Sequence, residues 1–263
     1  IYDVIFIDEM AHYSNADGAL VTGKKVVKFK HLDAKNLSNK MEKHLKNGEK
    51  PLIATDGLFP IWAELAPVDK YLKIANKFNG AVWVDDSHAV GIVGETGRGV
   101  YEYFHLNSER LFMGATLSKA FGAYGGFVVG NSNFIGAVKS GNVMTGTSSP
   151  SNAMVSAALK GLELVKNSPE LRRKLWDNAV YLKKGINNLG IHVEDNYLPI
   201  VTFVTENSGE MERIQQQLMD KGIYIQFVKY VGSGSDGVLR MVVTSSHTKE
   251  QIDFLISSLK KLI

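Results

Sequence analysis

Short apolar runs alternate with amphipathic stretches along the first two thirds of the chain. Residues 24–30 alternate valine and phenylalanine with lysine, which predicts a strand, whereas residues 36–46 carry Leu37, Met41 and Leu45 at helical spacing. Further strands are predicted at residues 1–7, 51–55, 81–84, 111–113 and 126–129, and further helices at 68–76 and 152–166. This order predicts an α/β fold, with a mostly parallel sheet and helices on both of its faces, over residues 1–168.

The pattern changes after residue 168. A long helix is predicted at 170–188, with leucines along one face. The solvated face is predicted to carry Arg172, Arg173, Lys174, Lys183 and Lys184. The remaining elements are strands at 200–204, 223–228 and 239–243 and helices at 210–221 and 248–262. This order predicts a smaller α+β domain with an antiparallel sheet over residues 169–263.

Composition narrows the classes of partner. The 263 residues include 30 Lys and Arg against 27 Asp and Glu, a net charge of +3 that is too small to argue for a nucleic acid or a lipid surface. The absence of cysteine excludes disulfides, thiolate metal sites and cysteine nucleophiles, and we expect no metal site. No apolar run is long enough to suggest a membrane span, and the first nine residues do not resemble a secretory signal, so we expect a cytoplasmic protein with a small-molecule partner.

Two polar segments directly follow predicted strands, where open α/β sheets bind their ligands. Residues 85–88 read Asp-Asp-Ser-His and are followed by a glycine-rich stretch, and residues 114–126 place Lys119 between hydroxyl side chains and glycines. Each feature alone has an ordinary structural explanation: a turn or helix-capping carboxylate, a hydrogen-bonded histidine, an exposed lysine. Neither the P-loop spacing nor a dinucleotide-binding glycine motif is present in a suitable context.

Taken together, the motifs resemble the α-oxoamine synthase family of pyridoxal 5′-phosphate (PLP) enzymes, which have the aspartate aminotransferase fold. The motifs that carry the resemblance are residues 85–91 (Asp-Asp-Ser-His-Ala-Val-Gly), 94–99 (Gly-Glu-Thr-Gly-Arg-Gly), 116–126 (Thr-Leu-Ser-Lys-Ala-Phe-Gly-Ala-Tyr-Gly-Gly), 8–14 (Asp-Glu-Met-Ala-His-Tyr-Ser) and 239–241 (Leu-Arg-Met). They extend over nearly the whole chain. The resemblance implies PLP as cofactor and a decarboxylative, Claisen-type condensation of an amino acid with an acyl-CoA that gives an α-amino ketone.

The resemblance also implies residue roles. Lys119 would bind PLP covalently and then act as the base at the substrate Cα, and Asp85 would pair with the protonated ring nitrogen of PLP. His12 would stack on the ring, and His88 would hydrogen-bond the phenolic oxygen of PLP or the thioester carbonyl. The hydroxyls expected to contact the PLP phosphate are those of Thr116 and Ser118.

Two further roles concern the substrate and a partner subunit. Arg240 resembles the residue that binds the substrate carboxylate, a task suited to a guanidinium fork. Thr147 and Ser148 lie where the family has hydroxyls that reach the PLP phosphate of the partner subunit. The resemblance therefore implies a homodimer with a shared active site.

The sequence departs from the family pattern in two places. The family begins well before its stacking histidine, with a glycine-rich segment that has no counterpart here, so we expect a fragment or an incomplete cofactor domain. Pro60 stands where a serine is expected near the cofactor, which leaves the acyl chain unassigned. Two alternatives remain open at this point: a PLP-dependent aminotransferase, and a degenerate, non-catalytic subunit of such an enzyme.

Overall fold

The structure is a computed structural model that describes residues 2–142 and 144–263, and these form two compact units. The first unit comprises the described residues up to Phe59 together with those from Leu65 to Asn167. The second comprises Pro60–Glu64 and Ser168–Ile263. The sequence pattern gave no sign that residues 60–64 pack with the C-terminal part.

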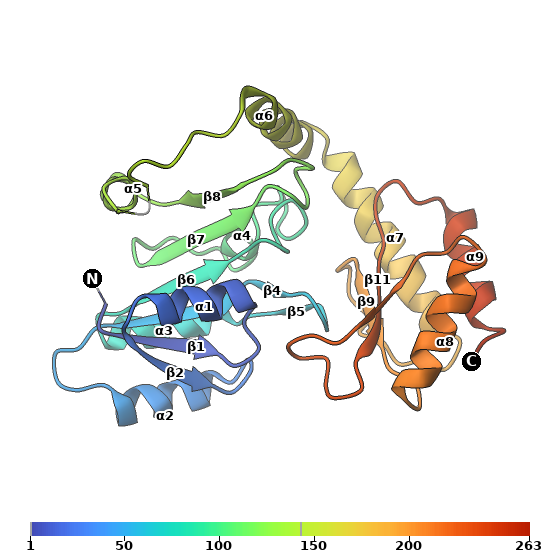
Figure 1. Cartoon of the computed structure of the whole chain (residues 1–263), viewed down its shortest axis with the longest axis horizontal. Coiled ribbons are helices and arrows are strands. Elements are labelled where there is room, and N and C mark those ends of the chain that lie inside the picture. Colours follow the sequence, from blue (N-terminus) through green and yellow to red (C-terminus); the bar gives the residue numbers. More distant parts are fainter. Residues whose placement is uncertain (1, 143) are drawn as a thin grey trace. The chain divides into compact units, whose positions relative to one another are not determined.

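The first unit is built on a six-stranded sheet in the order β2-β1-β3-β6-β7-β8 (Figure 1). Its strands are β1 (Val4–Asp8), β2 (Lys25–Phe29), β3 (Pro51–Asp56), β6 (Ala81–Asp85), β7 (Leu111–Thr116) and β8 (Gly126–Val129). All pair in parallel except β8, which runs antiparallel to β7. The prediction of a mostly parallel sheet is confirmed. Two short strands, β4 (Leu58–Phe59) and β5 (Glu64–Leu65), pair with each other.

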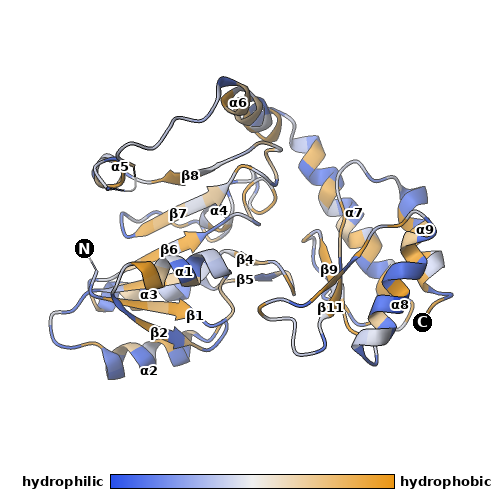
Figure 2. Cartoon of the chain, in the orientation of Figure 1, coloured by the Kyte–Doolittle hydropathy of each residue, from blue (hydrophilic) through white to orange (hydrophobic). Residues whose placement is uncertain are grey.

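Helices lie on both faces of this sheet. They are α1 (Tyr13–Val21), α2 (Ala34–His44), α3 (Val68–Lys77), α4 (Val100–Tyr103), α5 (Ser132–Lys139) and α6 (Asn152–Asn167). Ala19 of α1 packs against Ile5, Ile7 and Ala54 on one face. On the opposite face, Tyr71 of α3 meets the ring of Phe29 at a centroid distance of 5.5 Å. Because both faces are covered, β1 and β6 are hydrophobic along nearly their whole length (Figure 2). The same holds for β3, whose residues are nearly all buried.

The second unit is a three-stranded antiparallel sheet, in the order β10-β11-β9, packed with helices. Its elements are α7 (Pro169–Asn187), β9 (Ile200–Phe203), α8 (Ser208–Met219), β10 (Gln226–Val228), β11 (Val238–Val242) and α9 (Lys249–Leu259). The core joins Leu182 and Ile186 of α7, Ile214 of α8 and Ile252 of α9 to Leu239 of β11. The predicted α+β arrangement is confirmed. The predicted solvated face of α7 is wrong at Arg172 and Lys183, which are buried.

Helix α1 was not predicted, although it shapes the site described below. Its residues include Ser14, Asn15, Asp17 and Gly18, which are weak helix formers, so the sequence pattern is faint. His12 compensates as the N-cap, because its side chain accepts a hydrogen bond from the Ser14 N–H. Packing of Ala19 against the sheet supplies the rest. Within the described residues, no helix combines the length and apolarity needed to cross a membrane.

Candidate active site

The candidate site lies along the carboxyl edge of the parallel strands. Strands β1, β3, β6 and β7 end in Asp8, Asp56, Asp85 and Thr116, respectively. Asp56 pairs in register with Asp85, and Asp85 pairs with Gly114 on the next strand. Parallel strands end at the same edge, so the two polar segments singled out in the sequence share it.

A side-chain hydroxyl ties these two segments together. Asp85 Oδ1 accepts a hydrogen bond from the Ser87 N–H at 3.1 Å, which forms the turn after β6. Ser87 Oγ in turn accepts from the N–H of Thr116 at 2.9 Å. The turn that carries Asp85 is therefore fixed to the end of the strand that leads to Lys119. His88, partly buried, follows in the same turn.

Asp86 stabilises the backbone rather than facing the site. Its carboxyl is fully buried, with Oδ2 accepting from the Val100 N–H at 3.0 Å. A Cβ at Gly57 or Gly99 would lie 1.9 or 1.7 Å from the two carboxyl oxygens, so glycine is required on both sides. Burial raises the pKa of Asp86 to about 7, and the nearby charge of Asp85 acts in the same direction.

Lys119 lies in a closed loop after β7. Thr116 Oγ1 is 2.7 Å from Ser118 Oγ, donates to the carbonyl of Gly125 at 3.2 Å and accepts from the Ser118 N–H at 3.2 Å. The backbone N–H of Leu117 also bonds to the Gly125 carbonyl, at 2.9 Å. The loop thus presents Lys119 as an exposed side chain beyond a pair of neighbouring hydroxyls.

His12 is held at the start of α1. Its Nδ1 accepts a hydrogen bond from the N–H of Ser14 at 3.1 Å and lies 2.8 Å from Ser14 Oγ. These contacts fix the orientation of the imidazole ring. The backbone N–H of His12 donates to Asp56 Oδ1 at 3.1 Å, so His12 is attached to the same sheet edge as Asp85.

Three further predicted residues come from other parts of the chain. Arg240 is on β11 in the second unit, where Nε donates to the carbonyl of Pro60 at 2.7 Å and Nη1 to Gln226 Oε1 at 3.3 Å. Burial lowers the pKa of Arg240. Thr147 and Ser148 are exposed residues between α5 and α6. The roles of all three stay predictions.

The sequence analysis missed Asp56 and Asn15. Asp56 is 2% exposed, and its Oδ1 accepts from Asn15 Nδ2 at 2.8 Å in addition to the His12 N–H. Asp56 follows the apolar run 51–55, so the rule that picked out Asp85, a polar residue directly after a buried strand, also applies to it. Asn15 lies in the helix that the pattern did not predict.

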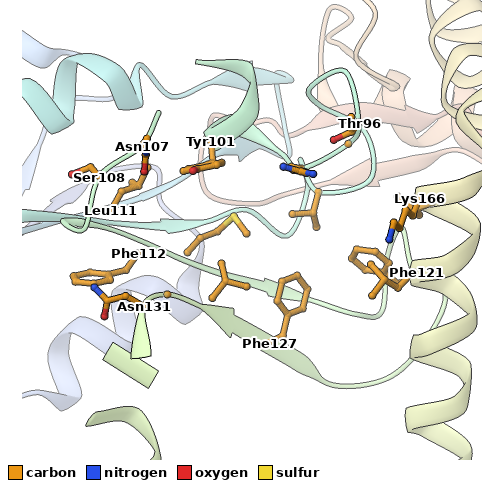
Figure 3. Close-up of a pocket in the computed structure, with 18 of the residues that line it drawn as sticks. Thr96, Tyr101, Asn107, Ser108, Leu111, Phe112, Phe121, Phe127, Asn131 and Lys166 are labelled. Carbon is orange, nitrogen blue, oxygen red and sulfur yellow. The ribbon is translucent and has the colours of Figure 1, made fainter. Parts of the chain in front are cut away.

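A pocket of about 740 Å³ in the first unit is separate from these residues (Figure 3). Its apolar wall includes Phe112, Phe121 and Phe127, and Thr96, Asn107 and Lys166 are among its polar lining residues. None of the predicted site residues lines it. Among the described residues, no group of three or more His, Cys, Asp or Glu side chains could hold a metal ion.

Comparison with known proteins assigns a class to this arrangement. The chain matches the aminotransferase class I and II family over residues 2–259, and it belongs to that family. Its relatives narrow the class. Proteins named 8-amino-7-oxononanoate synthase are 34% identical over 263 residues in Thermosipho melanesiensis, covering 99% of this chain and 67% of the relative, and 30% identical over 257 residues in Coprothermobacter proteolyticus, covering 97% and 65%. The resemblance to the α-oxoamine synthases is thereby confirmed.

Solved structures of named enzymes share the fold of this chain. A serine palmitoyltransferase from S. paucimobilis, with a bound PLP–myriocin aldimine, superposes with a TM-score of 0.93 at 26% identity, covering 99% of this chain and 66% of that one. An 8-amino-7-oxononanoate synthase from Francisella tularensis, 23% identical, shares the fold with a TM-score of 0.83 over 98% of this chain and 75% of its own. The chain spans about two thirds of the length of the curated relatives it matches.

Proposed function

We propose that the protein is a PLP-dependent acyltransferase of the α-oxoamine synthase type, which condenses an amino acid with an acyl-CoA thioester and releases the amino acid carboxylate as carbon dioxide. The observation that carries this proposal is the shared sheet edge, where the Ser87 hydroxyl joins the turn of Asp85 to the strand that leads to Lys119. The names of the relatives point to the same chemistry.

The donor set at this edge fits PLP. A carboxylate at Asp85 suits a protonated pyridine nitrogen, the Lys119 amine suits the aldehyde, and the adjacent hydroxyls of Thr116 and Ser118 suit a phosphate. When bound, PLP supplies a conjugated ring that accepts electrons from the substrate Cα.

Each residue of the candidate site has a separate role in the proposed reaction. Lys119 Nζ accepts the α-proton of the amino acid and later returns a proton to the product. Asp85 pairs with the ring nitrogen, and the imidazole of His12, oriented by its contact with Ser14, offers a flat face to the ring. His88, from the turn after Asp85, donates a hydrogen bond to a substrate or cofactor oxygen.

Arg240 binds the substrate carboxylate in this proposal. Its hydrogen bonds to Pro60 and Gln226 hold the guanidinium plane in one orientation, which favours a fork geometry. Thr147 and Ser148, both exposed, are assigned to the PLP phosphate of a second subunit, so we also propose a homodimer. A cytoplasmic location stays a prediction from the sequence.

A product assay separates the synthase from an aminotransferase. The protein is incubated with PLP, a series of small amino acids and acyl-CoAs of increasing chain length, and both free thiol and keto acid are measured. We expect thiol release that depends on both substrates. Keto acid without free thiol would instead support the aminotransferase.

A trapping experiment separates the synthase from a non-catalytic subunit. Borohydride reduction in the presence of PLP is expected to leave a stable mass adduct on the peptide that contains Lys119. Absence of an adduct together with absence of turnover would support a non-catalytic role.

A further inference from the structure

Asp56 and Asp85 form a pair of carboxylic acids on neighbouring strands. They are partners in the parallel register of β3 and β6, and paired residues of adjacent strands point to the same face of a sheet. Two residues earlier on each strand, Ala54 and Trp83 belong to the cluster that packs with Ala19 of α1. By strand alternation, Asp56 and Asp85 also face the side covered by α1.

Asp56 binds the first turn of α1. Its Oδ1 accepts from the His12 N–H at 3.1 Å and from Asn15 Nδ2 at 2.8 Å. Asn15 Oδ1 then accepts from the indole N–H of Trp83 at 3.1 Å. One buried network therefore joins β3, β6 and the helix that begins next to His12.

The charge of the pair also matters. Burial raises the pKa of Asp56 to about 7, the charges of Asp85 and Asp8 act in the same direction, and the hydrogen bonds from His12 and Asn15 oppose them. A carboxyl at Asp56 that keeps its proton adds no second negative charge next to Asp85.

We infer that Asp56 is a positioning residue of the active site: with Asn15 and Trp83, its buried carboxyl fixes the start of α1 and thereby the place of His12 at the sheet edge where Asp85 ends β6. Asp56 acts through His12 and Asn15 and need not touch the cofactor or the substrate. The inference rests on the proposed function and assigns a task to a buried acid that the proposed chemistry does not use.

The test compares two substitutions at Asp56. Asp56→Asn keeps a carbonyl oxygen that can accept both hydrogen bonds and carries no charge, whereas Asp56→Ala removes the acceptor. We expect the PLP dissociation constant to rise at least tenfold in Asp56→Ala and to stay within about threefold of the parent in Asp56→Asn. The absorbance spectrum of bound PLP should change in the first variant only.

A matched control uses another helix-capping aspartate. Asp33 caps α2 by accepting from the Asn36 N–H, so Asp33→Ala removes a comparable bond at a helix that does not carry His12. It is expected to leave PLP affinity and absorbance unchanged. If Asp56→Ala fails to fold, Asn15→Ala breaks the same network and is expected to weaken PLP binding in the same direction.

Hydrogen exchange on the protein without PLP tests the positioning network independently of the proposed PLP-dependent function. Faster exchange over residues 12–21 in Asp56→Ala, with normal exchange in Asp56→Asn, supports the positioning network even if the parent protein never binds PLP. Failure of the parent to bind PLP would count against the proposed function. Unchanged exchange and PLP affinity in Asp56→Ala, or equal losses in Asp56→Asn and Asp56→Ala, would overturn the inference.

Discussion

Among single residues, Gly99 shows how tightly the loop after β6 is built. Its backbone has φ 83° and ψ −159°, a combination almost restricted to glycine, and the carboxyl of Asp86 occupies the space of a side chain. Position 99 therefore tolerates no other residue well, because any side chain there would have an unfavourable backbone angle and would clash with the buried carboxyl of Asp86.

Gly99→Ala is therefore expected to destabilise the protein severely. The control is Gly48→Ala, where φ is 85° but nothing lies within 4 Å of the added Cβ. The left-handed backbone should cost about 1–2 kcal/mol at Gly48, and the clash with Asp86 should add at least about 2 kcal/mol at Gly99. Denaturant unfolding measures both values. Equal losses in the two variants would show that the loop relaxes around the added methyl group.

Lys119→Ala should abolish turnover while the fold is retained. Removal of a general base costs roughly 100- to 10,000-fold in rate, and here the covalent link to PLP is lost as well. Lys119 is exposed, so circular dichroism and the unfolding midpoint should not change. Lys139→Ala, at an exposed lysine of α5, serves as the control and should keep full activity. Turnover within tenfold of the parent would contradict the assignment of Lys119.

At the level of elements, the ends of β3 and β6 make stability depend on pH. The pKa of both Asp56 and Asp86 is raised to about 7 in the folded state, against about 4 for an unfolded chain. Between these values the folded state binds more protons than the unfolded state, so the free energy of unfolding falls as pH rises. Below about pH 4 and above about pH 7 the two groups add no slope.

Asp86→Asn should reduce that slope. Each such group contributes up to about 1.4 kcal/mol per pH unit, so removal of one should leave roughly half of the parent's slope between pH 4.5 and 6.5. The amide keeps an acceptor for the Val100 N–H, and the variant should be more stable than the parent at pH 8. Unfolding midpoints across this range test the expectation. An unchanged slope would mean that Asp86 is ionised in the folded protein.

Most of the long elements could be predicted from the sequence, because their apolar spacing is strong. The α3 and α7 helices and the parallel strands follow directly from periodicity. The α1 helix could not be predicted, since its stability comes from the His12 cap and from packing against the sheet. The short α4 helix begins at Val100, where Asp86 accepts the backbone N–H, a contact between residues 14 positions apart.

For the molecule as a whole, the candidate site could be predicted in part. The motifs containing Asp85 and Lys119 each follow a strand, and strand order alone brings them to one edge. Asp56 was missed although the same rule applies, because it stands in no recognised motif. Arg240 is in the other compact unit, and its role stays a prediction from the Leu-Arg-Met motif.

The first unit also exposes apolar side chains that bear on the proposed homodimer. Large exposed residues gather on α6, and they are Met154, Val155, Leu159, Leu162 and Leu164. At 100° per residue Val155, Leu159 and Leu162 share one side of the helix, and an exposed apolar surface of this kind favours association. In the same unit, β8 is an edge strand of the six-stranded sheet.

Leu159→Lys is expected to weaken self-association by tenfold or more, as measured by sedimentation velocity over a range of concentrations. The control is Leu20→Lys on α1, where the leucine is 65% exposed against 57% for Leu159. A charge at Leu20 should leave association unchanged. If both variants associate like the parent, α6 is not part of the dimer contact.

The bond between the Trp83 indole and Asn15 has a practical consequence. The chain contains three tryptophans, and Trp62 and Trp176 both belong to the second unit. Replacing these two with phenylalanine would leave Trp83 as the single tryptophan, next to the Asp56 network. Its fluorescence lifetime and quenching would then report occupancy at the sheet edge in real time, without any attached dye.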